Sequence, residues 1–227
     1  MGRFGGSIVE MGGYLFGFKE WMMRTVSDPE FVSVFLDKVT DIQMDYDPAG
    51  LEVAVKYVQI IKVSGEDLGM QSGPLYSPKM FHELFLPRLR RRWNAIRTHL
   101  DSVNPDVKIM LHSDGAIRTF IPDLIDSGIQ ILDPVQPLAA GMDPVGLNRD
   151  FGEKISFHGG IDIQEVLPFG TPSDVKSEVQ RNIKDFAPGG GYILSDSHLI
   201  QSDIPVENII AMFQSAQEFE KYPIRLE

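Results

Sequence analysis

The sequence contains no cysteine among its 227 residues. Disulfide bonds and thiolate metal ligands are therefore excluded. The chain also lacks an apolar run of the roughly 20 residues that cross a bilayer. Its first residues, MGRFGG, lack the apolar core and cleavage site of a secretory signal. We therefore expect a cytoplasmic protein that makes no contact with a membrane.

Positive charge is also scarce: the chain contains 21 Lys and Arg and 32 Asp and Glu, which gives a net charge of −11. An acidic chain is repelled by the phosphates of nucleic acid. The basic run Arg88–Arg92 is the exception, and a solvated helix face explains it better than a binding patch does. We expect a small-molecule substrate and no nucleic-acid partner.

Short apolar runs alternate with helical patterns along the chain. The runs are rich in Ile and Val and barely alternate with polar residues, which is typical of parallel strands buried on both faces. Repeated strand–helix order favours a parallel α/β fold with right-handed crossovers. Helix starts are marked by a capping residue before a proline, as at Asp28, Ser77 and Thr171. The predicted strands are Tyr57–Val63, Val107–Leu111, Ile129–Leu132, Ile155–Phe157, Tyr192–Leu194 and, more weakly, Ser7–Met11.

Polar residues follow nearly every predicted strand, and this favours a (β/α)8 (TIM) barrel over a doubly wound sheet. A barrel gathers all of these strand ends at one mouth, where its active sites lie. A doubly wound sheet favours a single Gly-rich phosphate loop, and the sequence has no GxGxxG. A complete barrel needs about 250 residues, so we expect one domain over residues 1–227 with about six βα units, incomplete at its N-terminus.

The stretch MLHSDGA, Met110–Ala116, ends a predicted strand with an imidazole and a carboxylate. Gly115 permits the turn that follows. His112 and Asp114 suit a metal site, but Asp114 could equally cap the next helix while His112 makes a local hydrogen bond.

Other strand ends supply further candidates. Glu66 and Asp67 are either a solvated turn or a catalytic carboxylate pair, one of them with a raised pKa. His158 is either a substrate contact or a locally hydrogen-bonded side chain, and Asp162 is either a ligand or a helix cap. Candidate substrate contacts at these ends are Gln71, Gln136, His158 and Asp162.

Four segments resemble the uroporphyrinogen decarboxylase superfamily, and the resemblance runs from about Gly5 to Ala216. They are SGEDLGMQSGPLYSPKMFHELFLPRLR, LHSDGAIRTFIPDLIDSGIQILDPVQP, ISFHGGIDIQEVLPFGTPSDV and GGGYILSDSHLIQSDIPVENIIAM. The resemblance implies a (β/α)8 barrel. It also implies either the decarboxylase activity or that of the methyltransferases that move methyl groups between corrinoid proteins and thiols or methoxylated substrates.

The resemblance also implies site residues. In the decarboxylase branch, His198 matches a substrate-binding histidine and Tyr14 a tyrosine, while no position carries the catalytic aspartate. In the zinc-binding methyltransferase branch, a His-x-Cys-Gly motif falls on His112–Gly115 and a later Cys on His198. A site of His112, Asp114 and His198 would hold a divalent metal, with zinc expected although the donors are harder than thiolates.

We therefore expect a metal-dependent methyltransferase that receives a corrinoid from a partner protein. Uroporphyrinogen decarboxylase is the alternative enzyme, and a truncated or degenerate barrel acting as a non-catalytic binding module is the third possibility. An incomplete barrel would expose strand edges and apolar surface, so we expect a homo-oligomer.

Overall fold

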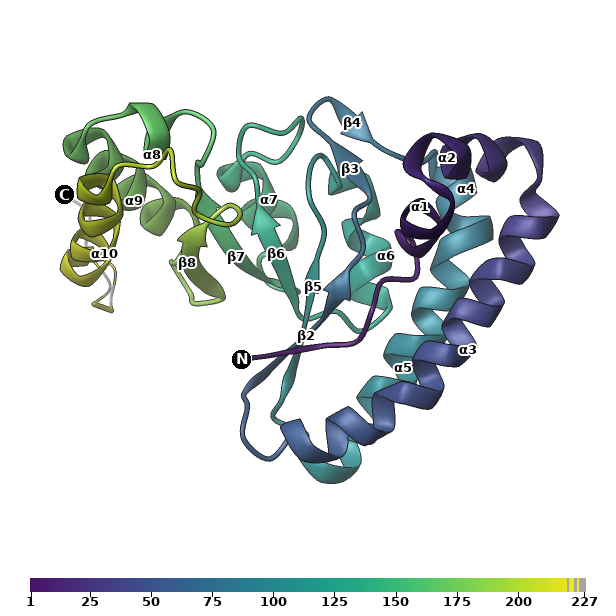
Figure 1. Ribbon diagram of the computed structural model, residues 1–227. Helices are drawn as coiled ribbons and strands as arrows, with labels where there is room; N and C mark the ends of the chain where they lie inside the picture. The colour runs from purple at the N-terminus through teal and green to yellow at the C-terminus, as the bar shows by residue number, and fades with distance from the viewer. Residues whose placement is uncertain (220, 223, 225–227) are drawn as a thin grey trace. The chain divides into compact units, whose positions relative to one another are not determined.

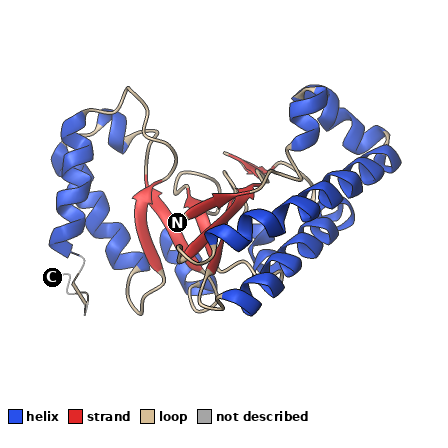
Figure 2. Ribbon diagram, turned by 60° about the horizontal axis from the view of Figure 1, so that its bottom comes forward, coloured by secondary structure: helices blue, strands red, loops and turns tan. Residues whose placement is uncertain are grey.

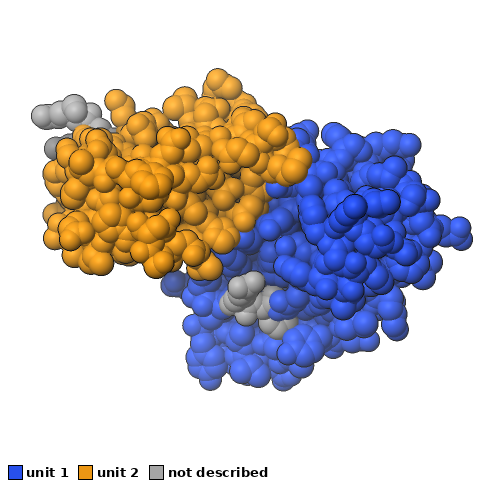
Figure 3. All heavy atoms as spheres, turned by 45° about the horizontal axis from the view of Figure 1, so that its top comes forward, with its two compact units in different colours: residues 1–69, 74–113, 119–131 blue, residues 70–73, 114–118, 132–227 orange. Residues whose placement is uncertain are grey.

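The computed structural model describes residues 1–219, 221, 222 and 224. Strands and helices alternate along the chain (Figure 1). The residues fall into two compact units (Figure 3), which are described separately. Unit 1 comprises Met1–Gly69, Pro74–Ser113 and Thr119–Ile131, and unit 2 comprises Met70–Gly73, Asp114–Arg118 and Leu132–Glu227. The organisation as one domain over residues 1–227 stays a prediction.

Unit 1 contains three parallel strands in the order β1, β2 and β5. Gly2 of β1 lies opposite Ile61 of β2, and Ile61 lies opposite Ile109 of β5. The register between β2 and β5 shifts at the carboxyl end of β2, just before Glu66. The strands are β1 (Gly2–Phe4), β2 (Ile60–Gly65) and β5 (Lys108–His112).

Two helices of unit 1 begin where the sequence predicts. Asp28 caps α3 by accepting a hydrogen bond from Phe31 N at 3.1 Å, and Ser77 caps α4 in the same way from Met80 N at 3.2 Å. The long helices α3 and α5 lie side by side (Figures 1 and 2). The elements are α1 (Met11–Phe16), α2 (Phe18–Ser27), α3 (Pro29–Ala54), α4 (Pro78–Met80), a π-helical turn (Phe81–Phe85), α5 (Leu86–Val103), a 3₁₀ turn (Arg118–Phe120), whose first residue is assigned to unit 2, and α6 (Ile121–Asp126).

The expectation that Arg88–Arg92 forms a solvated helix face is wrong for its two end residues. Arg88 and Arg92 are buried in α5. The guanidinium of Arg92 donates to both carboxylate oxygens of Asp47 at 2.8 and 2.9 Å, and Arg88 pairs with both oxygens of Asp37 at 2.8 Å. Both carboxylates belong to α3, so the packing of α3 on α5 turns these cations inward as bidentate ion pairs.

Unit 2 contains the strands β6, β7 and β8 in that order. Phe157 of β7 lies opposite Tyr192 of β8 in parallel register. Apolar side chains of α9 and α10 bury Ile161 of β7 in one core cluster. The elements are β6 (Ile131–Val135), α7 (Pro144–Phe151), β7 (Ser156–Ile161), α8 (Val166–Phe169), α9 (Pro172–Phe186), β8 (Tyr192–Asp196) and α10 (Val206–Phe219).

The parallel α/β fold predicted from the sequence is confirmed. The five principal strand predictions correspond to β2, β5, β6, β7 and β8, while β3 (Gly69–Met70) and β4 (Gly73–Pro74) form a separate two-stranded sheet. The weaker strand prediction, Ser7–Met11, is wrong, because this segment bends and then enters α1 at Met11. Among the described residues, no helix combines the length and apolar character needed to span a membrane.

The cap of α9 provides a test of local stability. Thr171 Oγ1 accepts a hydrogen bond from Asp174 N at 3.3 Å, and Asp174 accepts one from Thr171 N at 2.8 Å. Replacing Thr171 with Ala removes one half of this capping box, so the free energy of unfolding should fall by about 1 kcal/mol. Chemical denaturation measures this change. Ser177→Ala, on the exposed middle of the same helix, is the control, and an equal loss in both variants would contradict the capping role.

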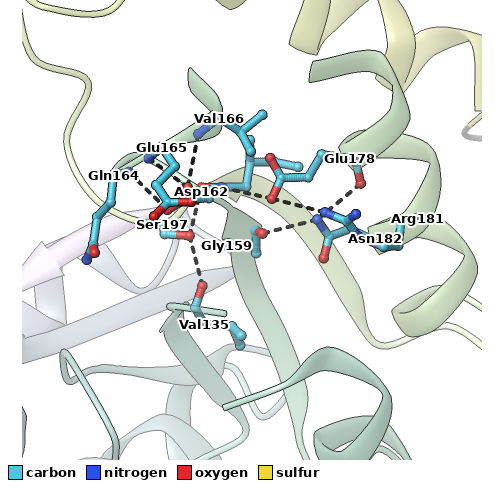
Figure 4. Close-up of polar contacts among 12 residues, drawn as sticks. Val135, Gly159, Asp162, Gln164, Glu165, Val166, Glu178, Arg181, Asn182 and Ser197 are labelled. Atoms are coloured by element: carbon cyan, nitrogen blue, oxygen red, sulfur yellow. Dashed lines mark hydrogen bonds and ion pairs between the residues drawn. The ribbon is translucent and has the colours of Figure 1, made fainter. Parts of the chain in front are cut away.

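Glu178 of α9 is a buried carboxyl group with incomplete hydrogen bonding. Its Oε1 accepts from Asp162 N at 3.3 Å and lies 3.6 Å from Arg181 Nη2, whereas Oε2 has no partner among the described residues (Figure 4). Burial raises the pKa of Glu178 from 4.5 to about 7.

The free energy of unfolding should therefore decrease as the pH rises through the range in which Glu178 loses its proton. Between pH 4.5 and about 7 the folded state binds more protons at Glu178 than the unfolded state does, so the free energy of unfolding decreases across this window. Glu178→Gln should remove the contribution of this carboxyl group to that decrease and be more stable than the original protein at pH 8. Urea titrations from pH 4.5 to 8 test this, with the exposed Glu207→Gln as control. Parallel curves for the Glu178 variant and the original protein would contradict the assignment.

Candidate functional site

Glu66 follows β2 in unit 1 and is completely buried. Its carboxylate accepts hydrogen bonds from Ser7 Oγ at 2.8 Å, Ile8 N at 2.9 Å and Val9 N at 2.7 Å. The backbone donors of this segment therefore bond to a side chain and not to a neighbouring strand, which explains why Ser7–Met11 is not a strand. These contacts give Glu66 a structural role, and its catalytic role stays a prediction.

The ionisation of Glu66 is balanced between opposing effects. Burial raises its pKa from 4.5 to about 7, whereas the bonds from Ile8 and Val9 and the charge of Arg92 pull the pKa down. Arg92 also donates to Gly6 O at 2.6 Å. Glu66 and Arg92 together thus fix the backbone of residues 6–9 in unit 1.

Two further carboxylates and an imidazole gather around Gly65, at the end of β2. His112 Nε2 lies 4.0 Å from Asp67 Oδ1. A Cβ atom on Gly65 would lie 3.2 Å from His112 Cδ2 and 3.3 Å from Glu10 Oε2, so the absence of a side chain here lets the groups approach closely. Burial, and next the negative charge of Asp67, raise the pKa of Glu10.

Tyr14 joins this group from α1. Its phenol donates to Glu10 Oε1 at 3.0 Å, although most of the side chain is exposed. The structure thus brings Tyr14, Asp67 and His112 into one region of unit 1 through Glu10, a residue that the sequence analysis missed. The sequence held no signal for Glu10, because it lies inside Ser7–Met11, the segment expected to be a strand.

His112 is the last residue of β5 in unit 1. Its carbonyl accepts a hydrogen bond from Glu66 N at 2.9 Å, and Ser113 Oγ accepts one from Leu68 N at 3.2 Å. These bonds fix the backbone of the end of β5 against the segment that follows β2, so the position of the imidazole follows from the pairing of the two strands.

Asp114 and His198 contact each other within unit 2. Asp114 Oδ2 lies 3.4 Å from His198 Nε2, and both side chains are half-buried. Gly115 then turns the chain with a φ of 81°, as the sequence predicts, and donates its N–H to Gln136 Oε1 at 2.6 Å. The loop after β8 therefore presents His198 to the aspartate that follows the end of β5.

The remaining polar candidates of unit 2 make local contacts. Gln71 donates from Nε2 to Leu138 O at 2.7 Å and accepts from Gln164 Nε2 at 3.3 Å. His158 Nδ1 lies 2.6 Å from Asp133 Oδ1, and Asp133 is buried. The substrate-binding roles predicted for Gln71, Gln136 and His158 stay predictions.

Asp162 caps the start of α8 (Figure 4). Its carboxylate accepts hydrogen bonds from Gln164 N at 2.9 Å, Glu165 N at 2.8 Å and Val166 N at 3.0 Å. Nearby, Ser197 Oγ lies 3.0 Å from Val135 O and 2.7 Å from Ile161 O, so it ties the loop after β8 to β6 and β7. The geometry matches the helix-cap alternative for Asp162.

Sequence reasoning did not select Asp133 or Ser197 as site residues. Ser197 directly follows β8, and Asp133 lies inside β6 but directly follows the strand Ile129–Leu132 predicted from the sequence, so a place after a predicted strand was the available signal. Neither residue belongs to a motif of its own.

The model of the family "Uroporphyrinogen decarboxylase (URO-D)" matches residues 3–219. A uroporphyrinogen decarboxylase of Chlorobium phaeovibrioides is 24% identical over 216 residues, covering 92% of this chain and 55% of the relative. The corresponding protein of Pseudoalteromonas translucida is 21% identical over 202 residues, covering 85% and 50%.

Among solved structures, a methyltransferase from Methanosarcina mazei matches with a TM-score of 0.71 at 20% identity, covering 95% of this chain and 58% of that one. At this identity the likeness shows the fold alone. The chain spans about half the length of the curated relatives it matches. Because the family model covers nearly all of the described residues, the chain belongs to the uroporphyrinogen decarboxylase family.

Proposed function

We propose that this chain acts in metal-dependent methyl transfer between a corrinoid carried by a partner protein and a small thiol or methoxylated substrate. The family is enzymatic, and the fold is similar to that of a methyltransferase. The observation that carries the proposal is the contact between Asp114 and His198 in unit 2. Both residues occupy positions that, by the resemblance to the zinc-binding methyltransferase branch, correspond to metal ligands.

His112 completes the proposed set of ligands. It precedes Asp114 by two residues, and two residues of extended chain span at most about 7 Å, so covalent connection alone keeps their backbones close. Each of the three half-buried side chains offers one ligand atom. Two imidazole nitrogens and a carboxylate oxygen suit Zn²⁺, and the absence of thiolate also admits harder divalent ions.

A bound ion would supply Lewis-acid activation of a thiol or an ether oxygen. The protein's own residues would orient the substrate and handle its proton. Asp67 suits this role because it is partly exposed and lies 4.0 Å from His112 Nε2. Glu66 would act mainly by fixing the backbone beside Asp67, since its carboxylate is completely buried and accepts hydrogen bonds from Ser7 Oγ and Val9 N.

Removing the histidine of the Asp114–His198 contact tests the proposed site. His198→Ala should lose most of the bound divalent metal and lower methyl transfer by orders of magnitude, because several kcal/mol of transition-state stabilisation depend on the ion. The fold should survive, since His198 lies in a loop after β8 and is part-exposed. Elemental analysis and turnover of a corrinoid methyl donor, measured on the same preparation, decide the outcome.

His82→Ala is the matched control. His82 lies on the π-helical turn of unit 1, where Nε2 contacts Asp123 Oδ2 at 2.8 Å, and it is not one of the proposed ligands. It should retain both metal and activity. A His198→Ala protein with full metal content and full turnover would refute the proposed site.

Decarboxylation of uroporphyrinogen is the second candidate, favoured by the names of the curated relatives. That substrate carries many carboxylates and requires cationic partners. In unit 1, however, the groups near His112 are Glu10 and Asp67, and the buried Arg92 is engaged by Asp47. We therefore expect metal-free protein not to decarboxylate uroporphyrinogen, and chromatography of the reaction products would detect any decarboxylation.

A homo-oligomer stays a prediction, which light scattering tests.

A further inference from the structure

Unit 1 contains a small cavity of about 200 Å³ between α1, α2 and the segments that follow β2 and β4. This is smaller than the pockets of about 300–1,000 Å³ that hold drug-sized ligands, so its occupant would be small. The cavity is lined by Glu10, Gly13, Tyr14, Phe18, Trp21, Asp67, Leu75 and Tyr76.

The charged side chains that line the cavity are both acidic. Its ionisable acids are Glu10 and Asp67, and none of the described residues that line it is a lysine, an arginine or a histidine. Tyr14 Oη donates to Glu10 Oε1 at 3.0 Å and so holds one carboxylate in place. A cation placed here would be attracted by two carboxylates in a half-buried setting, where electrostatic attraction is stronger than in water.

The rest of the wall is largely aromatic. Trp21 and Tyr76 are buried, whereas Tyr14 and Phe18 are exposed. Trp21 is held firmly, because its ring packs 5.3 Å from the ring of Phe35 and because a Cβ on Gly12 would lie only 2.1 Å from Trp21 Cδ2. The helix α1 therefore packs directly on the indole, and the wall is formed before any ligand binds.

We propose that this cavity binds a small methylated ammonium cation. Carboxylates supply the countercharge, and aromatic rings attract cations and pack against methyl groups. A divalent metal ion suits the cavity less well, since it requires several oxygen ligands and most of the wall is aromatic or apolar. The proposal concerns binding in unit 1 and stands whether or not the chain transfers methyl groups.

Tetramethylammonium is the probe, and tert-butanol is its neutral analogue of similar shape. Trp21 lines the cavity and the sequence holds two tryptophans, so Trp93→Phe leaves Trp21 as the only indole. Its fluorescence should change saturably with tetramethylammonium at pH 8 and not with tert-butanol or with sodium chloride of equal ionic strength. Isothermal titration calorimetry of the original protein should give the same affinity for tetramethylammonium, which shows that the Trp93→Phe substitution does not cause the binding.

The charge requirement is tested at Glu10. Glu10→Gln should weaken tetramethylammonium binding about tenfold or more, because it removes one countercharge while keeping the size of the side chain. Glu52→Gln, on the exposed side of α3, removes the same charge elsewhere in unit 1 and should leave the affinity unchanged. The absence of saturable binding, equal binding of tert-butanol, or equal affinity in Glu10→Gln would each overturn the proposal.

Discussion

The buried carboxylate of Glu66 is the interaction on which the functional region of unit 1 depends. This carboxylate accepts hydrogen bonds from the backbone N–H groups of Ile8 and Val9, and the backbone N–H of Glu66 donates to the carbonyl of His112. One residue thus joins the segment before α1 to the carboxyl ends of β2 and β5. The position of Glu10 beside Asp67, and with it the wall of the acidic cavity, follows from this attachment.

In unit 2 the loops after parallel strands carry most of the polar network. Ser197 bonds to the ends of β6 and β7, Gln136 receives the N–H of Gly115, and Asp162 caps α8. These bonds fix the loops from which Asp114 and His198 approach each other. The arrangement agrees with the rule that strand ends supply functional groups while the sheet supplies rigidity.

Much of the fold could be predicted from the sequence, because buried parallel strands and proline-preceding caps leave strong local signals. The N-terminal segment could not. Ile8 and Val9 have the apolar character of a strand, but their donors bond to Glu66, which lies far along the chain. Arg88 and Arg92 were misjudged for the same kind of reason, since their partners Asp37 and Asp47 come from α3.

For the site, the sequence identified residue types and strand ends better than individual roles. The pair Asp114 and His198 was selected from family resemblance, and the structure brings the two side chains into contact. The cavity of unit 1 was missed, because Glu10, Trp21 and Tyr76 converge from separate segments and no spacing pattern relates them. Tyr14 and Asp67 were selected, but for other roles.

The central claim is that position 114 ligates a divalent metal ion together with His112 and His198. The most direct measurement is the near-ultraviolet and visible absorption spectrum of cobalt-substituted protein carrying Asp114→Cys. If residue 114 is a ligand, the new thiolate should give an intense sulfur-to-cobalt charge-transfer band that the unsubstituted aspartate protein lacks, and His198→Ala in the same background should weaken it. A variant that binds cobalt without this band, or binds none, would contradict the account.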